Sequence, residues 1–304
     1  MRRIALVKIL PHPYAIQMDH QDTGVIAFVL GAMQDGGLPH IGCSCPRCAA
    51  ALSDPSRTRY AASLAIIDRR GPKTAVWIID ATPDIKWQLA LLARDLGRHP
   101  RRLGRLRQPD ALFLTHAHLG HIGGLPQFGA EAMAVEQLVV YAPPRLSTLL
   151  HESELWRPLS AQLDFNPFPA GEKITLAPQL TISAVPVPHR DELGTGTVAY
   201  QINGPRRSLL YLPDIDDWDQ WPEAGVRLNQ VDYALVDASF YSVDELGGRA
   251  PVVHPLVTDT LERFRTIPGQ LILTHINHTN PILDENSAAN QAVLESGARI
   301  ARQG

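Results

Sequence analysis

The stretch THAHLGH, residues 115–121, places three histidines within six residues, directly after the apolar run ALFL. A strand that ends in histidines puts imidazoles at the edge of a sheet, where His116 and His118 point the same way and His121 follows from the start of a helix. Neutral imidazole is the commonest metal ligand in proteins. The spacing therefore predicts a metal site with His116, His118 and His121 among its ligands.

Four further polar residues follow apolar runs in the same manner. An aspartate in such a place can simply cap a helix, and a histidine can fill a corner of the core. Polar side chains at the ends of several strands, however, converge on one edge of a sheet, and a metal pocket is built in that way. We therefore add to the candidate site Asp80 after AVWII, His189 after TISAVPVP, Asp214 after SLLYLP and His275 after LILT.

A second group of candidate ligands is GCSCPRC, in which Cys43, Cys45 and Cys48 lie within six residues. Cysteines this close are poor candidates for disulfides that span the fold, whereas their thiolates favour one zinc ion in a tetrahedral site. The alternatives are three free buried cysteines or a redox cluster. The fourth zinc ligand is either His40 or His278. We favour His278, because the loop THINH then serves the active site with its first histidine and a structural zinc with its second.

The elements around these residues indicate the class of fold. Short apolar, β-branched runs bounded by Gly, Pro, Asp or Asn recur along the chain, beginning at Val25 to Leu30, and each is typical of a strand. The clearest helical patterns are residues 82–96, where Thr82 can cap, and residues 284–297, where Asp284 can cap. Strands come in groups without strict alternation with helices. This order predicts an α/β sandwich of two sheets with outer helices, in preference to a doubly wound sheet.

The chain of 304 residues is 45% hydrophobic and 19% charged, with a net charge of -3, which is ordinary for a globular protein with a sizeable core. A weakly acidic chain has no broad positive field to attract nucleic acid or an anionic membrane. No apolar segment approaches the roughly 18–20 residues that span a bilayer, and we interpret residues 1–10 as an opening strand in place of a signal peptide. We therefore expect a cytoplasmic protein, with neither nucleic acid nor membrane as partner. It would form one domain over residues 1–304 with a zinc knuckle at residues 40–50. The sequence does not decide between a monomer and a homodimer.

In their order along the chain, the motifs resemble those of the metallo-β-lactamase superfamily: an aspartate, the string H-x-H-x-D-H, then a histidine, an aspartate and a histidine. The resemblance implies an αββα sandwich of two mixed β-sheets with outer helices. Asp80 matches the aspartate that normally supports a ligand from behind. The resemblance also implies the metal ligands. The first metal would be held by His116, His118 and His189, and the second by His121 and His275. Asp214 would bridge the two metals.

The histidine string departs from this pattern at Gly120, where the superfamily carries an aspartate that binds the second metal. Glycine has no side chain, so the second ion would lose a charged oxygen ligand. The resemblance therefore implies one strongly held ion and a second site that is weak or empty. Asp35, beside glycines in QDGG, is interpreted as a turn residue and not as part of the site.

Two families within the superfamily share more with the sequence. The cysteine motif and the segments ATPDI, DASFYSVDEL and HINHTNPILDENS resemble the pyrroloquinoline quinone biosynthesis protein B family over most of the chain. The three intact histidines of the string, together with the pair His275 and His278, are similar to the cyclic phosphodiesterases of the carbon-phosphorus lyase pathway.

These residues make a metal-dependent hydrolase the first hypothesis. A metal-activated water would attack an ester or phosphodiester bond of a small-molecule or peptide-derived substrate, and His254 in APVVHPL could donate a proton. We expect Zn²⁺ in the structural site and one or two active-site ions, with Zn²⁺ favoured over Fe²⁺ or Mn²⁺. The alternatives are an iron-dependent oxidative enzyme of cofactor biosynthesis, which the resemblance implies, and a non-catalytic carrier or binding protein. The residues that would serve catalysis are Asp214, His121, His275 and Asp80.

Overall fold

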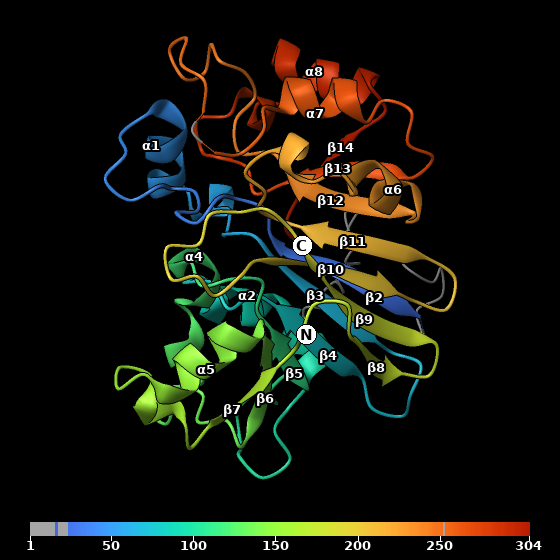
Figure 1. Cartoon of the computed structure of the whole chain (residues 1–304). Coiled ribbons are helices and arrows are strands. Elements are labelled where there is room, and N and C mark those ends of the chain that lie inside the picture. The colour runs from blue at the N-terminus through green and yellow to red at the C-terminus, as the bar shows by residue number, and fades with distance from the viewer. Residues whose placement is uncertain (1–15, 18–23, 252) are drawn as a thin grey trace, which may run out of the picture.

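The computed structural model describes residues 16–17, 24–251 and 253–304, and residues 1–10, where an opening strand is predicted, lie outside that part. Two β-sheets pack face to face at the centre of the molecule, and helices cover the outer face of each sheet (Figure 1). The predicted αββα sandwich of two mixed sheets with outer helices is confirmed.

The first sheet has seven strands that lie side by side in chain order. Pairing is antiparallel from β1 to β4 and parallel from β4 to β7. Strands β3 and β5 are buried at every residue, because both faces of the sheet are covered. The strands are β1 (Ile16–Gln17), β2 (Val25–Gly31), β3 (Ser63–Asp68), β4 (Ala75–Ile79), β5 (Ala111–Phe113), β6 (Leu138–Ala142) and β7 (Leu163–Pro167).

The second sheet also has seven strands in chain order. Pairing is antiparallel from β8 to β11 and parallel from β11 to β14. The strands are β8 (Lys173–Ala177), β9 (Leu180–Pro186), β10 (Val198–Asn203), β11 (Ser208–Leu212), β12 (Tyr233–Asp237), β13 (Gln270–Thr274) and β14 (Arg299–Ile300).

An aromatic cluster joins the two sheets. The ring of Phe113 on β5 packs edge-on against Tyr200 on β10, with centroids 5.6 Å apart, and against Phe168, with centroids 6.0 Å apart. The Tyr200 hydroxyl donates to the carbonyl of Leu114 at 2.7 Å, so its one polar group is satisfied inside the core. The last residues before the histidine string are thereby fixed against the second sheet.

The helices bury their apolar faces against the outer faces of the sheets. On the first sheet lie α2 (Ile85–Leu91), α3 (Ala93–Leu96) and α5 (Pro144–Glu152), and on the second lie α6 (Ala224–Asn229), α7 (Val257–Arg263) and α8 (Ala288–Glu295). Short 3-10 helices are η1 (Pro55–Arg57), η2 (Leu125–Phe128), η3 (Arg157–Leu159), η4 (Trp218–Gln220) and η5 (Pro281–Leu283). None of the described helices has the length and the apolar character that a membrane span requires.

Two predicted helices begin later than expected. The pattern at 82–96 becomes α2 and α3, with Asp84 as the residue before α2, and the Thr82 hydroxyl accepts from the Asp84 N–H at 3.2 Å. The pattern at 284–297 becomes α8, which Ser287 caps by accepting from the N–H of Asn290 at 3.0 Å. The residues just before α8 form η5, so Asp284 ends that element and does not start the helix.

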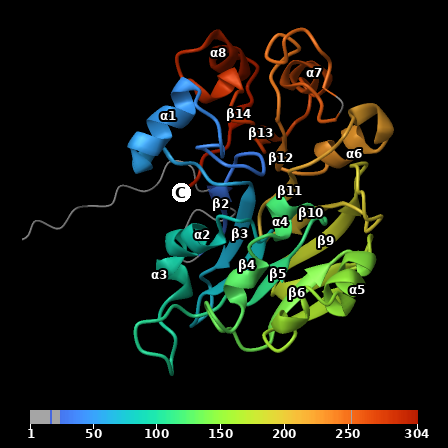
Figure 2. The ribbon, with the colours of Figure 1, turned by 90° about the vertical axis from the view of Figure 1, so that its left-hand side faces the viewer.

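The strands that precede the candidate ligands all end at one edge of the sandwich. Parallel neighbours β4 and β5 share a direction, and so does β2, because antiparallel β3 separates it from β4. In the second sheet β9, β11, β12 and β13 share one direction for the same reasons. The loops after these strands carry the candidate ligands. At this edge α4 (Leu119–Ile122) lies between the two sheets, with α1 (Pro46–Ser53) beside the second (Figure 2).

The end of β2 depends on a glycine at position 31. A Cβ at Gly31 would lie 2.1 Å from the carbonyl oxygen of Ala61, which is backbone and cannot turn aside. We predict that Gly31→Ala lowers the free energy of unfolding by about 1–3 kcal/mol through overpacking, measured by urea denaturation. The matched control is Gly225→Ala in α6, where no described atom lies within 4 Å of the new methyl group. This control should be neutral or stabilising by up to about 1 kcal/mol, and equal losses in the two variants would contradict the prediction.

Candidate metal centre

Three imidazoles from two loops form the first group of the centre. His116 and His118 follow β5, and His189 follows β9. His116 Nε2 lies 2.9 Å from His118 Nδ1, and His189 Nε2 lies 3.2 Å from the same nitrogen. Three ring nitrogens therefore face one point.

The other nitrogens of His118 and His189 face carboxylates. His118 Nε2 forms a hydrogen bond of 3.0 Å with Glu192 Oε2, whereas His189 Nδ1 lies 2.8 Å from Asp216 Oδ1 without the geometry of a hydrogen bond. An ionised carboxylate only accepts, so the proton of a neutral His118 ring belongs on Nε2 and its converging Nδ1 presents a lone pair. Burial lowers the pKa of His189, which favours the neutral ring that binds metals.

Thr115 fixes the position of the ring proton of His116 on Nδ1. The Thr115 hydroxyl donates to Asp80 Oδ2 at 2.9 Å and lies 2.9 Å from His116 Nδ1. Since a hydroxyl has one hydrogen, it accepts from His116 Nδ1–H, and Nε2 is left with its lone pair. Burial holds the pKa of His116 well below its usual range. Three converging lone pairs repel one another unless a cation lies between them, and this nitrogen set fits a zinc ion.

Asp35, His121 and His275 form a second group beside the first. Asp35 Oδ1 lies 3.3 Å from His121 Nε2 and 3.3 Å from His275 Nε2. Asp214 lies between the two groups: its Oδ2 is 3.1 Å from His121 Nε2, and its Oδ1 is 3.3 Å from His275 Nε2 and 3.7 Å from His189 Nε2. The carboxylate of Asp214 therefore reaches ligand nitrogens of both groups.

Asp80 supports both groups from behind. It is fully buried at the end of β4, where its backbone has a φ of 67°. Its Oδ2 lies 2.8 Å from His121 Nδ1, and its Oδ1 accepts from the backbone N–H of Thr115 at 2.8 Å. Hydrogen bonds to ligand histidines of this kind fix the orientation of the ring.

A second buried aspartate, Asp237 at the end of β12, supports His275. The Ser239 hydroxyl donates to Asp237 Oδ1 at 2.8 Å and lies 3.0 Å from His275 Nδ1. Because the hydroxyl hydrogen goes to the carboxylate, His275 donates from Nδ1, and its Nε2 faces Asp35 and Asp214. The backbone φ of His275 is 56°, a strained value for a residue with a side chain, and such values concentrate at functional sites.

The charged groups of the centre shift one another's pKa values. Burial by itself would lower the pKa of His275, but the carboxylates around it, Asp214 first, raise that pKa to about 10. Burial opposes the charge on Asp214, yet His275 and His121 hold the pKa of Asp214 well below its usual range. The carboxylates thus demand positive charge, which protons on the imidazoles or a metal ion in their place can supply.

The donor set of the second group also fits a metal ion. Asp214 is 3% exposed, and its Oδ2 accepts no hydrogen bond of normal geometry from any residue that the structure describes. A buried ionised oxygen without a donor is costly. Carboxylate oxygens mixed with imidazole nitrogens are suitable ligands for zinc, iron or manganese.

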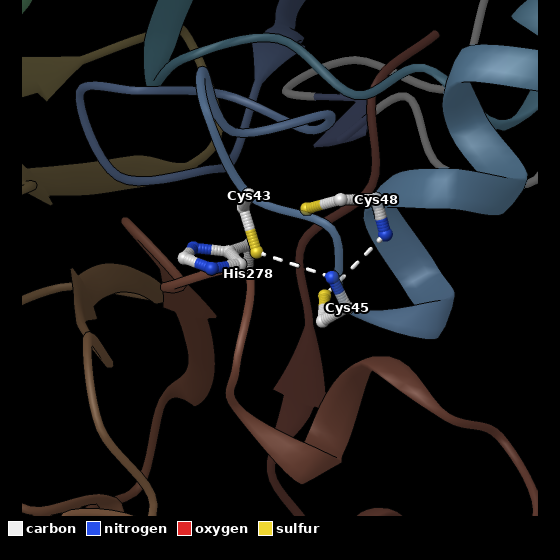
Figure 3. A group of neighbouring side chains, drawn as sticks. All are labelled: Cys43, Cys45, Cys48 and His278. Atoms are coloured by element: carbon white, nitrogen blue, oxygen red, sulfur yellow. Dashed lines mark hydrogen bonds between the residues drawn. The ribbon is translucent and has the colours of Figure 1, made fainter.

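The cysteine motif forms a separate group. Cys43, Cys45, Cys48 and His278 offer ligand atoms that all lie within 4.8 Å of one another (Figure 3). Cys45 precedes α1, and its Sγ accepts from the N–H of Cys48 at 3.5 Å, while Cys43 Sγ accepts from the N–H of Cys45 at 3.5 Å. The N–H of Cys48 lowers the pKa of Cys45, whereas burial raises the pKa of Cys48 to about 11.

The structure brings His278, and not His40, to the three sulfur atoms. His278 Nδ1 is buried and has no hydrogen-bond partner among the described residues. A free nitrogen beside three sulfurs fits a tetrahedral zinc site. The ring of His40 instead stacks on His278, with centroids 4.5 Å apart, and its backbone N–H donates to Cys48 Sγ at 3.3 Å.

The predicted ligands lie in these groups and Asp80 lies behind them, but two further aspartates of the centre were not predicted. Asp35 was interpreted as a turn residue, and it does lie in a turn, yet its side chain joins the second group. Asp237 was not considered. The signal that could have found both is the one used for the other ligands, because Asp35 follows the predicted strand at Val25 and Asp237 ends the apolar run YALV.

Comparison with known proteins agrees with this architecture. A model described as the beta-lactamase superfamily domain matches residues 77–276. The chain therefore belongs to the metallo-β-lactamase superfamily. Within it the chain is similar to coenzyme PQQ synthesis protein B. The protein from Methylobacterium sp. strain 4-46 is 30% identical, with 91% of this chain and 98% of that protein covered. The one from Azotobacter vinelandii is 26% identical, with 91% and 97% covered.

Solved structures show the same fold. The Zn²⁺-bound PqqB from Methylobacterium extorquens superposes with a TM-score of 0.77 at 23% identity, covering 91% of this chain and 98% of that one. A diphosphatase from the PhnP family superposes with a TM-score of 0.67 at 23% identity, covering 92% and 96%. The resemblance to the protein B family is confirmed by the sequence relatives, and the PhnP-family structure shares the fold.

The metal content of a knuckle variant tests the cysteine group. We predict that Cys45→Ser loses about one zinc ion per chain, because the tetrahedron lacks a thiolate, while the metal at the histidine groups is kept. The measurement is elemental analysis of protein purified without added metal. Ser44→Ala, an exposed neighbour in the same loop, is the matched control and should keep its zinc. Equal zinc in Cys45→Ser and Ser44→Ala would remove the knuckle from the interpretation.

Proposed function

We propose that the protein is a metal-dependent hydrolase that acts on an ester or phosphodiester bond. The observation that carries the proposal is the pair of adjacent ligand groups that share the Asp214 carboxylate. His116, His118 and His189 would hold one ion, and His121 and His275 would take part in binding another. Ions bound there would activate water and polarise a substrate oxygen.

The residues behind the ligands would keep this geometry during the reaction. Asp80 holds His121 through Nδ1, and Asp237 acts on His275 through Ser239. Rings fixed in this way keep their lone pairs on the site, which costs no reorganisation when the reaction occurs. Among the described ligand side chains, Asp35 is the exposed one, at 45%, so a substrate can approach from that side.

His254 is suited to deliver the proton that the leaving group needs. It is 4% exposed, and its Nδ1 lies 2.6 Å from Asp237 Oδ2. Burial alone would lower the pKa of His254, but the Asp237 carboxylate raises it above its ordinary value. As water forms its bond to phosphorus or carbon and the bond to the leaving oxygen breaks, His254 would protonate that oxygen from Nε2. The ring lies beside the ligands His189 and His275, with centroids 5.6 and 5.5 Å away.

The hydrolytic role is tested with two chromogenic probes, bis(p-nitrophenyl) phosphate and p-nitrophenyl acetate, and with the zinc-loaded protein. We predict that His116→Ala loses both metal from the active site and all hydrolysis, because a ligand nitrogen is missing. The matched control is His151→Ala, an exposed histidine on α5, which should keep both. Full activity in His116→Ala would refute the assignment of the site.

The role of His254 is tested by the dependence on the leaving group. The backbone φ of His254 is 69°, a conformation that asparagine tolerates, so His254→Asn is the suitable variant. We predict that kcat falls by about 10²–10⁴-fold for a phosphodiester with an alkyl leaving group, which needs protonation, and far less for a nitrophenyl leaving group. Metal content should stay unchanged. Equal losses for the two leaving groups would mean that His254 does not act as the acid.

A second candidate function follows from the similarity to coenzyme PQQ synthesis protein B over 91% of the chain. An iron ion in the same histidine and carboxylate site would support an oxidative step on a tyrosine-bearing peptide precursor of that coenzyme. The measurement is oxygen uptake by protein loaded anaerobically with Fe²⁺, with and without a tyrosine-containing peptide. Uptake that requires iron, peptide and His116 would favour this function, and its absence in all combinations would leave hydrolysis as the better proposal.

A further inference from the structure

The space that an aspartate at position 120 would occupy is filled by Asp35. Gly120 is fully buried in α4, and a Cβ built on it would lie 2.1 Å from Asp35 Cγ, 2.3 Å from its Oδ1 and 2.5 Å from its Cβ. Real Cβ atoms do not approach other atoms so closely. The missing side chain at 120 and the carboxylate at 35 are therefore two parts of one arrangement.

We propose that Asp35 supplies the charged oxygen ligand that Gly120 lacks, so that the protein holds a second active-site ion between Asp35, His121, His275 and Asp214. This inference deepens the proposed function and rests on it for the site itself. Asp35 Oδ1 lies at equal distances of 3.3 Å from His121 Nε2 and His275 Nε2, facing both nitrogens that a second ion would use. A carboxylate from another loop thus takes the place in the site that a side chain at position 120 would occupy.

The buried Asp214 oxygen is an independent sign of a cation here. Asp214 Oδ2 is on the side of His121 Nε2, 3.1 Å away, and accepts no hydrogen bond of normal geometry within the described part of the chain. His121 Nδ1 already faces Asp80, so its Nε2 has no proton to give in the neutral ring. With neutral rings, two carboxylates and two imidazole nitrogens thus point at one place without a donor among them. Either a second proton on each ring or a metal ion must supply the missing positive charge, and a single divalent cation satisfies all four groups.

The loop that carries Asp35 is fixed to the loop that carries His275. The N–H of Gln34 donates to the Ile276 carbonyl at 2.9 Å, and the N–H of Ile276 donates to the Ala32 carbonyl at 2.8 Å. These bonds hold the backbone just before Asp35 against the backbone just after His275. Asp35 is therefore presented by a backbone pairing between the ends of the two sheets and does not depend on a free turn.

The cysteine group extends this attachment. The Arg47 guanidinium donates to the His278 carbonyl, and the ring of His40 lies against Gly36, where a Cβ would be 2.4 Å from His40 Cδ2. The knuckle residues therefore clamp both loops just beyond the two ligands. A zinc ion in the knuckle would hold Asp35 and His275 at their observed separation.

The first experiment is metal content and affinity in Asp35→Ala. We expect the variant to lose about one ion per chain, or to bind the weakest-held zinc about 10–100-fold less tightly or worse, because a charged ligand is removed. Zinc is titrated into metal-free protein against a chromophoric chelator, and elemental analysis gives the stoichiometry. The matched control is Asp164→Ala, an exposed aspartate on edge strand β7. Unchanged zinc stoichiometry and affinity in Asp35→Ala would overturn the proposal.

The second experiment exchanges the two positions. The double variant Asp35→Gly with Gly120→Asp moves the carboxylate back to α4 and removes the side chain that would clash with it. We expect it to regain the ion that Asp35→Ala loses, whereas Gly120→Ala alone should lose that ion by displacing Asp35. Failure of the double variant to bind more zinc than Asp35→Ala would overturn the claim that the two positions serve one site.

Both experiments read metal binding and not catalysis, so they separate this inference from the proposed function. Loss of the ion in Asp35→Ala together with its return in the double variant supports the inference even if no ester is hydrolysed, which would count against the proposed function alone. Conversely, the wild-type protein could hydrolyse the ester while Asp35→Ala keeps an unchanged zinc stoichiometry and affinity. That result would support the proposed function and overturn this inference.

Discussion

The carboxylate of Asp214 is the point on which the centre depends. An ionised group that is 3% exposed is tolerated only where positive charge or donors surround it. His121 and His275 lie 3.1 and 3.3 Å from its two oxygens, and both rings are held by further buried carboxylates. The edge of the sandwich is therefore an alternation of buried acids and imidazoles. The negative charge of these acids is balanced only when protons or metal ions lie between the carboxylate oxygens and the imidazole nitrogens.

Strand direction explains why these residues meet. Every ligand except those of the knuckle follows a strand whose carboxyl end lies at the same edge, and the aromatic contacts between Phe113 and Tyr200 fix the two sheets relative to each other. Three of the six described non-glycine residues with positive φ lie at this edge: Asp80, His254 and His275, with φ values of 67°, 69° and 56°. Such conformations are costly and are kept where packing on all sides dictates them.

The cysteine group and the candidate metal centre share two loops. One loop runs from Gly31 to the cysteines and the other from His275 to His278, so each loop contributes to both groups. A metal site that holds its ligands across two loops reduces the freedom of both. The cysteine group thus positions the outer side of the candidate metal centre, while the two sheets fix its inner side.

Much of this protein is determined by sequence alone. The histidine string, the cysteine spacing and the apolar runs before Asp80, His189 and Asp214 predict the sandwich and most of the candidate ligands, because strand ends and short ligand spacings are local properties of the chain. The start of α8 is not fixed by the local sequence, since both Asp284 and Ser287 can cap and the structure uses Ser287. These features need no knowledge of which loops approach one another.

Only the tertiary structure decided which distant loops meet. Asp35 and Gly120 occupy one space, His254 pairs with Asp237, and His278 reaches the cysteines while His40 stacks outside them. In the sequence Asp35 follows a predicted strand as the other ligands do, but the glycines beside it favour an ordinary turn. A ligand is defined by where its oxygen lies in space, and that position is set by the packing of two sheets and by hydrogen bonds between loops that are far apart along the chain.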